Sequence, residues 1–317
     1  MKLTNEELKK IYFGAYSFKE EDGYLRAYQY TKEQMDYFKE AFDFWYDRCM
    51  ASTAKTLEFR SSARKVAFDY KIIWKGSEDS FELLTDGLVS KIFYVKDLKD
   101  EGRLEFNLEE GEKDVIIYLP ADATVLIRNF EIDGEYKAAQ KSEKVLWLGD
   151  SITQGFGPLR SSQIYVSVAN RLLNYDIINQ GIGGYVYDKK SLMLMPGYKP
   201  EKLIVALGTN QYGTKTMTDI EEYYETLFSI YGKDIPTLCI TPIWRGDYDD
   251  PKALDTLISF CDKLKAIVSS YPNIKIVDGF KLVPHLEEYY LDKLHPNCLG
   301  AEIYGRNLVE EIRKNGF

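Results

Sequence analysis

Val145-Leu-Trp-Leu-Gly-Asp-Ser-Ile-Thr-Gln-Gly155 is the stretch that decides the fold, because four apolar residues run directly into a short polar loop. A short continuous apolar run is typical of a strand that is buried on both faces. Comparable runs follow at 203–207, 237–240 and 275–277. Segments with a helical pattern alternate with them, at 161–174, 217–232, 251–271 and 298–314. Strands that alternate with helices predict a parallel sheet with helices on both faces, which is an α/β fold.

The residues before this stretch have a different pattern. A polar helical start and a helix-like stretch around 30–46 come first. Short β-rich runs then follow, separated by turn signals instead of helices, at 56–59, 66–74, 91–95 and 114–119. Many short strands without intervening helices predict an antiparallel β-sandwich. We therefore expect a β-rich accessory domain over 1–140, a jelly-roll-like sandwich, followed by an α/β domain over 141–317.

The composition favours a soluble protein without a nucleic-acid partner. Of the 317 residues, 45% are hydrophobic, and the formal net charge is −9. A nucleic-acid-binding protein needs a basic face to displace phosphate counterions, which this charge balance disfavours. No window reaches the about 18 consecutive apolar residues of a membrane span. The N-terminal residues lack the apolar stretch of a secretory signal. We therefore expect a cytoplasmic protein with no membrane partner.

We expect neither a metal nor another cofactor. Four cysteines are scattered along the chain: Cys49, Cys239, Cys261 and Cys298. None of them forms the close pair typical of a metal site, so free thiols in a reducing compartment are expected. The two histidines, His285 and His295, are too few for a zinc site built on several imidazoles. His285 lies in an apolar neighbourhood and is expected to be structural.

A serine follows the first predicted strand of the α/β half, in Gly149-Asp-Ser151. At the carboxyl end of a strand in an open parallel sheet, its hydroxyl would face the cleft where such folds bind ligands. Asp-Ser pairs are also common in turns and helix caps, so this motif alone indicates little. Thr153 stands where the nucleophile turn of α/β-hydrolases has a glycine, so the segment is not that turn.

An aspartate and a histidine lie close together near the end of the chain, in Asp292-Lys-Leu-His295. A serine hydroxyl attacks esters poorly unless a nearby base takes its proton. A neutral imidazole is such a base at pH 7, and a carboxylate can fix its tautomer and stabilise the imidazolium. Pro296 favours an extended backbone at His295. Taken alone, the pair is more often a surface aspartate and a core histidine.

Two further segments follow predicted strands and offer hydrogen-bond donors. Asn179-Gln-Gly-Ile-Gly-Gly184 contains glycines whose amides can approach a ligand closely. Leu207-Gly-Thr-Asn210 places an asparagine at the end of a strand. Acyl transfer needs donors directed at the oxyanion that forms on the attacked carbonyl. Each segment alone is also compatible with an ordinary turn between a strand and a helix.

Together and in this order, the four segments resemble the SGNH/GDSL hydrolase superfamily, which is named for its Ser, Gly, Asn and His blocks. The resemblance implies a flavodoxin-like three-layer α/β/α domain with serine esterase activity. It implies that Ser151 is the nucleophile and that Asp292 and His295 complete a catalytic triad. It also implies an oxyanion hole formed by the amides of Ser151 and Gly184 and by the side chain of Asn210.

The resemblance covers roughly 143–317 and includes two departures. Gln211 stands where the third block usually has an aspartate, so a supporting contact is expected to differ. The second block ends in adjacent glycines, and the spacing from Asn179 favours Gly184 over Gly183 as the donor.

A β-rich domain before such a catalytic domain resembles two-domain bacterial carbohydrate esterases, which remove acetyl groups from polysaccharide fragments. We therefore expect hydrolysis of short-chain acyl esters, in particular O-acetyl groups on an oligosaccharide substrate. Residues near the expected cleft that could hold a sugar are Tyr185, Tyr187, Tyr212, Trp244 and Arg245. Capping of the core is an equal alternative for them. A lipase or thioesterase of the same superfamily and a non-catalytic carbohydrate-binding protein are the competing functions, and the oligomeric state stays open.

Overall fold

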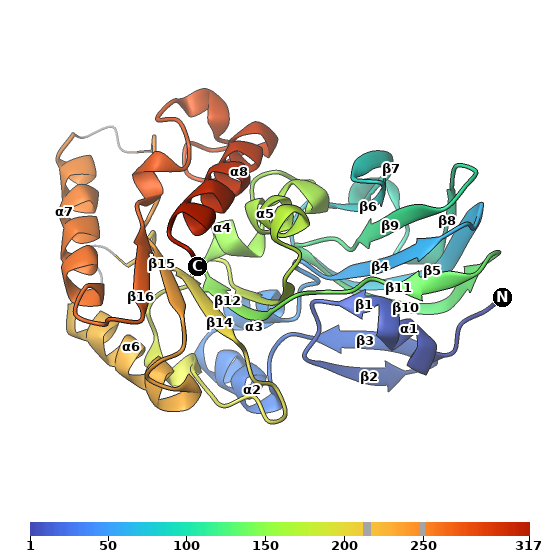
Figure 1. Cartoon of the computed structure of the whole chain (residues 1–317), viewed down its shortest axis with the longest axis horizontal. Coiled ribbons are helices and arrows are strands. Elements are labelled where there is room, and N and C mark those ends of the chain that lie inside the picture. The colour runs from blue at the N-terminus through green and yellow to red at the C-terminus, as the bar shows by residue number, and fades with distance from the viewer. Residues whose placement is uncertain (212–216, 248–250) are drawn as a thin grey trace.

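The computed structural model describes residues 1–211, 217–247 and 251–317. Figure 1 shows a β-rich half, formed by the first part of the chain, beside an α/β half formed by the rest. The short helix α1 (Asn5–Ile11) lies on the β-rich half. Tyr212, one of the expected sugar contacts, is outside the described residues.

Two antiparallel sheets form the β-rich half. The strands of the first sheet are β1 (Tyr12–Phe13), β4 (Thr56–Ser61), β6 (Ser80–Thr85), β7 (Leu88–Tyr94), β9 (Lys113–Tyr118) and β11 (Tyr136–Ala138). Their order is β1-β4-β9-β6-β7, with β11 paired to β4. The strands of the second sheet are β2 (Ser17–Glu21), β3 (Tyr24–Tyr28), β5 (Lys65–Lys75), β8 (Glu101–Asn107) and β10 (Ala123–Ile132). Their order is β2-β3-β10-β5-β8.

These two sheets share one hydrophobic core. Phe59 of β4 packs edge-on against Phe130 of β10, with 6.0 Å between the ring centroids. The ring of Phe68 in β5 lies 6.2 Å from that of Phe81 in β6. In β5 the alternate residues Phe68, Tyr70 and Ile72 are buried, which is the pattern of a strand with one face on the core. Aromatic side chains from opposite sheets therefore meet between them.

The α/β half contains a parallel sheet. Its strands are β12 (Lys144–Gly149), β13 (Asp176–Gly181), β14 (Lys202–Ala206), β15 (Thr237–Ile240) and β16 (Ile274–Val277). Their order is β13-β12-β14-β15-β16, and all neighbours are parallel. This is the strand order of flavodoxin-like folds, which bind ligands beyond the carboxyl ends of the strands where the order reverses. The loop after β12 lies at that point.

Helices cover both faces of the parallel sheet. Helices α5 (Tyr165–Leu173) and α8 (Cys298–Lys314) pack on one face, and α6 (Met217–Tyr231) and α7 (Pro251–Val268) pack on the other. On the first face the rings of Tyr165 and Tyr304 stack with centroids 3.9 Å apart. The four helices overlap the segments expected from the sequence pattern. No helix in the described ranges is long and apolar enough to cross a membrane.

Two helices that precede residue 140 pack on the α/β half. The stretch around 30–46 forms α2 (Lys32–Ala41) and α3 (Asp43–Cys49), which are separated by the extended backbone of Phe42. The ring of Phe38 in α2 is buried and lies 5.6 Å from that of Tyr185 in the α/β half. Both helices therefore contribute to the core beneath the parallel sheet (Figure 1).

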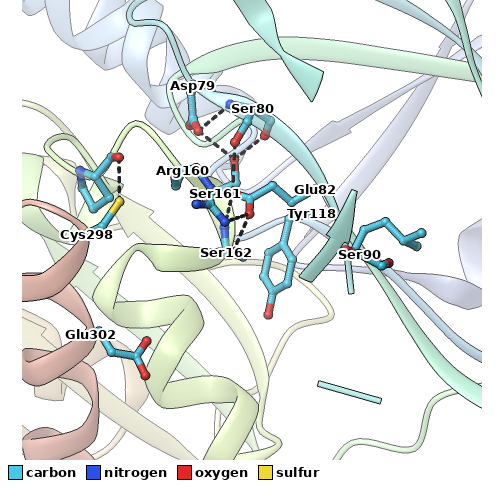
Figure 2. A network of polar contacts seen from close by, with 12 residues as sticks. Asp79, Ser80, Glu82, Ser90, Tyr118, Arg160, Ser161, Ser162, Cys298 and Glu302 are labelled. Carbon is cyan, nitrogen blue, oxygen red and sulfur yellow. Dashed lines mark hydrogen bonds and ion pairs between the residues drawn. The ribbon is translucent and has the colours of Figure 1, made fainter. Parts of the chain in front are cut away.

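A buried polar network also joins the two halves (Figure 2). Glu82 of β6 accepts hydrogen bonds from Arg160 Nη2 and from the Ser162 hydroxyl, each at 2.7 Å. Asp79, directly before β6, accepts one from the Ser161 hydroxyl at 2.9 Å. The two serines belong to a short 3-10 helix that precedes α5. These contacts hold the segment that leads into α5 against the first antiparallel sheet.

Candidate active site

Ser151 lies where the central strand β12 passes into the short helix α4 (Ser151–Gln154). The side chain of Asp150 caps this helix by accepting the Ile152 N–H at 3.0 Å. Burial raises the pKa of Asp150 to about 7. A Cβ at Gly149 would lie 2.1 Å from Thr153 Oγ1, so the turn requires a glycine there. The capped turn holds the Ser151 hydroxyl at the carboxyl edge of the sheet.

Ser151, His295 and Asp292 form a hydrogen-bonded series. Ser151 Oγ and His295 Nε2 are 2.8 Å apart. On the other side of the ring, His295 Nδ1 lies 2.8 Å from Asp292 Oδ2. The second oxygen of Asp292 accepts the backbone N–H groups of Leu294 at 3.1 Å and His295 at 2.8 Å. A hydroxyl, an imidazole and a carboxylate in this order can move a proton from the serine to the histidine.

The electrostatic surroundings favour a neutral imidazole. Burial lowers the pKa of His295 below its usual 6.5, and the Asp292 carboxylate acts in the opposite direction. Although partial burial acts to raise it, the hydrogen bonds from His295 hold the pKa of Asp292 below its usual value. At neutral pH the series therefore consists of a hydroxyl, a free base and an ionised carboxylate.

The loop that carries this histidine is folded tightly. The Leu291 N–H donates to the His295 carbonyl at 2.8 Å, and Lys293 between them has a left-handed backbone with φ 66°. The ring of Phe156 packs edge-on against the imidazole, with 4.7 Å between centroids. Its backbone and a neighbouring ring therefore both hold the imidazole in place.

Among the described residues, two backbone N–H groups at the site have no hydrogen-bond acceptor within the protein. Within the described ranges, neither the Ser151 N–H nor the Gly184 N–H donates a hydrogen bond to another residue. The Gly183 N–H, in contrast, donates to Gln154 Oε1 at 2.7 Å. Gly184 has a left-handed backbone with φ 69°, which a glycine adopts without strain. The geometry thus distinguishes the two glycines that the sequence left open, and favours Gly184 as a donor to a ligand.

The third block is held against the glycine block. Asn210 Nδ2 donates to the Tyr185 carbonyl at 3.0 Å, which fixes the plane of the Asn210 amide. Gln211 is fully buried, and its Oε1 accepts the Tyr187 N–H at 2.5 Å. The glutamine at position 211, where the family usually has an aspartate, therefore has a structural role. Its side-chain amide holds the backbone that follows the glycines.

One pocket of about 210 Å³ collects these groups. Ser151, Gly184, Asn210 and His295 all line it. Its remaining wall includes three residues from the β-rich half: Phe44, Arg48 and Asp122. A larger hollow of about 380 Å³ lies on the β-rich half, where Arg103 and Glu131 already pair with each other. The smaller pocket is the candidate active site because it holds the reactive groups.

Sequence reasoning missed the three residues from the β-rich half. None belongs to a motif, and none is near the four blocks in sequence. Phe44 and Arg48 reach the pocket because α3 packs over the glycine block, and Asp122 lies in the turn between β9 and β10. Asp122 Oδ1 accepts a hydrogen bond from Gln154 Nε2 at 2.6 Å. Burial raises the pKa of Asp122 to about 6, and Arg48 acts to lower it.

The structure does not bring the expected sugar contacts of the glycine block to the pocket. Tyr185 is 5% exposed and packs edge-on against the rings of Phe38 and Trp45. Tyr187 is 1% exposed in the same core. A ring enclosed in this way has no free face for a sugar, so these tyrosines fill the core that α2 and α3 complete.

The expected contacts after β15 lie beside the site. Trp244 stacks on His285, with ring centroids 5.7 Å apart and planes 9° from parallel. Arg245 donates to the Thr209 carbonyl at 2.9 Å and pairs with Asp247 at 2.6 Å. Neither Trp244 nor Arg245 is among the described residues that line the pocket. His285 Nε2 lies 2.8 Å from the Phe280 carbonyl, which fits its expected structural role.

The four cysteines are free: Cys49, Cys239 and Cys261 are buried and Cys298 is partly buried. The described residues contain no cluster of histidine, cysteine and acidic side chains that could hold a metal ion.

Comparison with known proteins gives a family match over the α/β half. Residues 147–303 match the GDSL-like lipase/acylhydrolase family. No curated protein matches the chain in sequence.

Solved structures resemble nearly the whole chain. A Bacteroides ovatus protein described as a GDSL-like lipase is 16% identical, with a TM-score of 0.77 over 99% of this chain and 97% of its own. The salicylyl-acyltransferase SsfX3 from a tetracycline biosynthetic pathway is 18% identical, with a TM-score of 0.73 over 96% and 94%. A family two carbohydrate esterase from Clostridium thermocellum, solved with cellohexaose, is 19% identical, with a TM-score of 0.64 over 84% and 93%. At these identities the likeness is one of fold.

Proposed function

We propose that this chain, whose residues 147–303 match the GDSL-like lipase/acylhydrolase family, is a serine esterase for short acyl esters, chiefly O-acetyl groups on oligosaccharides. The observation that carries this proposal is the hydrogen-bonded series of Ser151, His295 and Asp292 beside unengaged backbone amides. Serine, base and orienting carboxylate are the parts that acyl transfer requires.

In the proposed mechanism, Ser151 Oγ attacks the ester carbonyl while His295 Nε2 takes its proton. Asp292 holds the Nδ1–H tautomer and stabilises the imidazolium. The carbonyl oxygen becomes an oxyanion, which accepts hydrogen bonds from the Ser151 and Gly184 amides and from the Asn210 side chain. The C–O bond to the alcohol then breaks, and His295 returns the proton to the leaving alkoxide. Water repeats these steps on the acyl-enzyme and releases the acid and Ser151.

The size of the pocket supports a short acyl group. A volume of about 210 Å³ suits an acetyl group together with part of its alcohol, whereas a lipase needs room for a long chain. The carbohydrate esterase that was solved with cellohexaose has this fold, which supports a sugar as the alcohol. The pairing of each reactive group with its expected partner also disfavours a non-catalytic binding protein.

The domain organisation is part of the same proposal. We propose an accessory β-sandwich over 1–140, of jelly-roll-like type, and a catalytic domain over 141–317. The two antiparallel sheets with a shared core and the separate parallel sheet support this division.

Hydrolysis of aryl esters and of acetylated oligosaccharides tests the function. We expect wild type to cleave 4-nitrophenyl acetate faster than the decanoate, and to release acetate from acetylated xylo- or manno-oligosaccharides by mass spectrometry. Ser151→Ala and His295→Ala should each remove most of the turnover, and the double variant should be little worse than either, because the two residues act as one unit. Independent, multiplicative losses would contradict the assigned roles, and a faster reaction on the decanoate would favour the lipase alternative.

A further inference from the structure

Arg48 is a cation in the candidate active site that the proposed mechanism does not use. It lies on α3 and lines the same pocket as Ser151 and His295. Its guanidinium carbon is 3.4 Å from the centroid of the Phe44 ring, and its Nη1 donates to the Phe44 carbonyl at 3.2 Å. The aromatic ring and the carbonyl together fix the guanidinium within the wall of the pocket.

In the described part of the chain Arg48 forms no ion pair within 4.0 Å, and the carboxylates of Asp122 and Asp47 attract it only from farther away. Each of the other arginines has a carboxylate oxygen within 4.0 Å, whereas Arg48 has none. The nearby carboxylate of Asp122 is buried and engaged by Gln154 instead. Arg48 is half-buried, and burial lowers its pKa. A partly desolvated cation that lacks a close ion pair is costly, and an anion supplied by a ligand at hydrogen-bond distance would offset part of that cost.

Arg48 also lies directly against the glycine block. A Cβ placed on Gly183 would be 2.7 Å from Arg48 Cδ and 2.9 Å from Arg48 Nε. The neighbouring Gly184 carries the backbone N–H that is proposed to bind the oxyanion. A substrate whose ester reaches Ser151 therefore passes close to the guanidinium.

We infer that Arg48 binds a carboxylate of the substrate, so that the preferred esters are acetylated acidic sugars, such as uronic acid units. The inference rests on the proposed esterase function and adds a substrate class to it. The planar fork of a guanidinium matches the two oxygens of a carboxylate, which makes such pairs stronger than contacts to neutral hydroxyls. An acetyl group has no carboxylate, so the charge belongs to the alcohol part of the ester.

A matched pair of substrates tests this selectivity. One is an acetylated uronic acid glycoside, and the other is its methyl ester, which has nearly the same shape without the charge. We expect wild type to prefer the free acid by roughly 10- to 100-fold in kcat/KM. Arg48→Gln should bring the ratio close to one, and Arg48→Lys should keep part of it, because the charge remains while the fork is lost.

The ratio is measured on a single preparation of each variant, so a loss of folded protein cancels. Arg64→Gln is the control, because Arg64 is an exposed arginine of the β-rich half that pairs with Glu110, and it should keep the wild-type ratio. No preference in wild type, or an unchanged ratio in Arg48→Gln, would overturn the inference. The pair 4-nitrophenyl hemisuccinate and its methyl ester locates the carboxylate, because an Arg48-dependent preference in this pair alone would assign the charge to the acyl group.

A binding measurement separates this inference from the esterase proposal. Calorimetric titration of Ser151→Ala with sodium glucuronate requires no turnover. We expect at least tenfold weaker binding when Arg48→Gln is added to Ser151→Ala. Equal affinities would reject the carboxylate contact even if the enzyme hydrolyses acetyl esters, and a clear loss would support it even if hydrolysis failed.

Discussion

Among single residues, Gln154 connects the two halves of the chain at the reactive centre. Its Nε2 donates to Asp122 of the β-rich half, and its Oε1 accepts the N–H of Gly183. The side chain is 1% exposed, so both contacts are shielded from water. Through Gly183 it sets the position of Gly184, the next residue, whose N–H is proposed to bind the oxyanion. Gln154 is therefore a positioning residue for that donor.

We predict that Gln154→Ala lowers kcat by roughly 10- to 100-fold while KM changes little, because a displaced donor acts mainly on the transition state. Steady-state kinetics with 4-nitrophenyl acetate measure both constants. Gln140→Ala, which changes an exposed glutamine, is the control and should behave as wild type. A change confined to KM would mean that Gln154 contacts the substrate instead.

The pH dependence of the rate follows from His295. The imidazole must be neutral to accept the serine proton, and burial lowers its pKa below 6.5. We therefore predict that kcat/KM is level above pH 7 and falls as the pH drops through a midpoint below 6.5. Because the unfolded chain takes up this proton more readily, the same shift removes stability as the pH falls through that range. A rate that stays level down to pH 4 would exclude His295 as the base.

Asp292→Asn gives this prediction a second measurement. The carboxylate raises the pKa of His295, so its removal should move the acid limb to a lower pH. The rate should also fall, by as much as about 10⁴-fold, because an amide no longer fixes the tautomer. An acid limb that moves to a higher pH would contradict the assigned partner.

At the scale of elements, the position of the segment that leads into α5 depends on the polar network around Glu82. Glu82 is fully buried, and Arg160 supplies its charged partner. We predict that Arg160→Ala lowers the free energy of unfolding by about 3 kcal/mol, near the lower end for a broken buried pair, because the Ser162 hydroxyl still donates to Glu82. Denaturant titration followed by fluorescence measures the change. Arg64→Ala, which breaks the exposed pair with Glu110, should cost less than about 1 kcal/mol.

The secondary-structure elements also differ in how far the sequence alone predicts them. The buried strands around Val145 and Leu203 were predictable, because a strand covered on both faces has a continuous apolar run. The close approach of Ser151, Asp292 and His295 was expected from the family resemblance, because Ser151 follows a strand whereas Asp292 and His295 lie in the loop before the last helix. The structure adds how far apart their atoms lie and which of the two glycines has an unengaged amide.

The part of the pocket wall that comes from α3 and from Asp122 could not be predicted in this way. Arg48 and Asp122 reach the pocket because segments far apart in the chain pack together. A local sequence pattern does not predict such packing. Tyr185 illustrates the same difficulty, because a tyrosine suits a sugar-binding cleft and a core equally well. Its burial depends on Phe38 and Trp45, which the sequence pattern did not place beside it.

At the scale of the whole molecule, the two halves share both core and polar contacts. Helices α2 and α3 complete the core of the α/β half, and the network of Glu82 and Arg160 joins that half to β6. We therefore predict a single cooperative unfolding transition on heating, at which near-ultraviolet circular dichroism and esterase activity are lost together. Two well-separated calorimetric transitions would show that the halves unfold independently.

The contribution of α2 and α3 has a consequence for synthesis on the ribosome. Tyr30 and Phe38 leave the ribosome long before Tyr185, against which Phe38 packs, and before the helices that complete the core they share. The antiparallel sheets of the nascent chain can close while these aromatic side chains still face water. Until the later strands emerge, they form an apolar surface of the kind that chaperones bind and that promotes aggregation. Helix α2, which precedes the pocket helix α3, is thus a part of the nascent chain whose partners are synthesised much later.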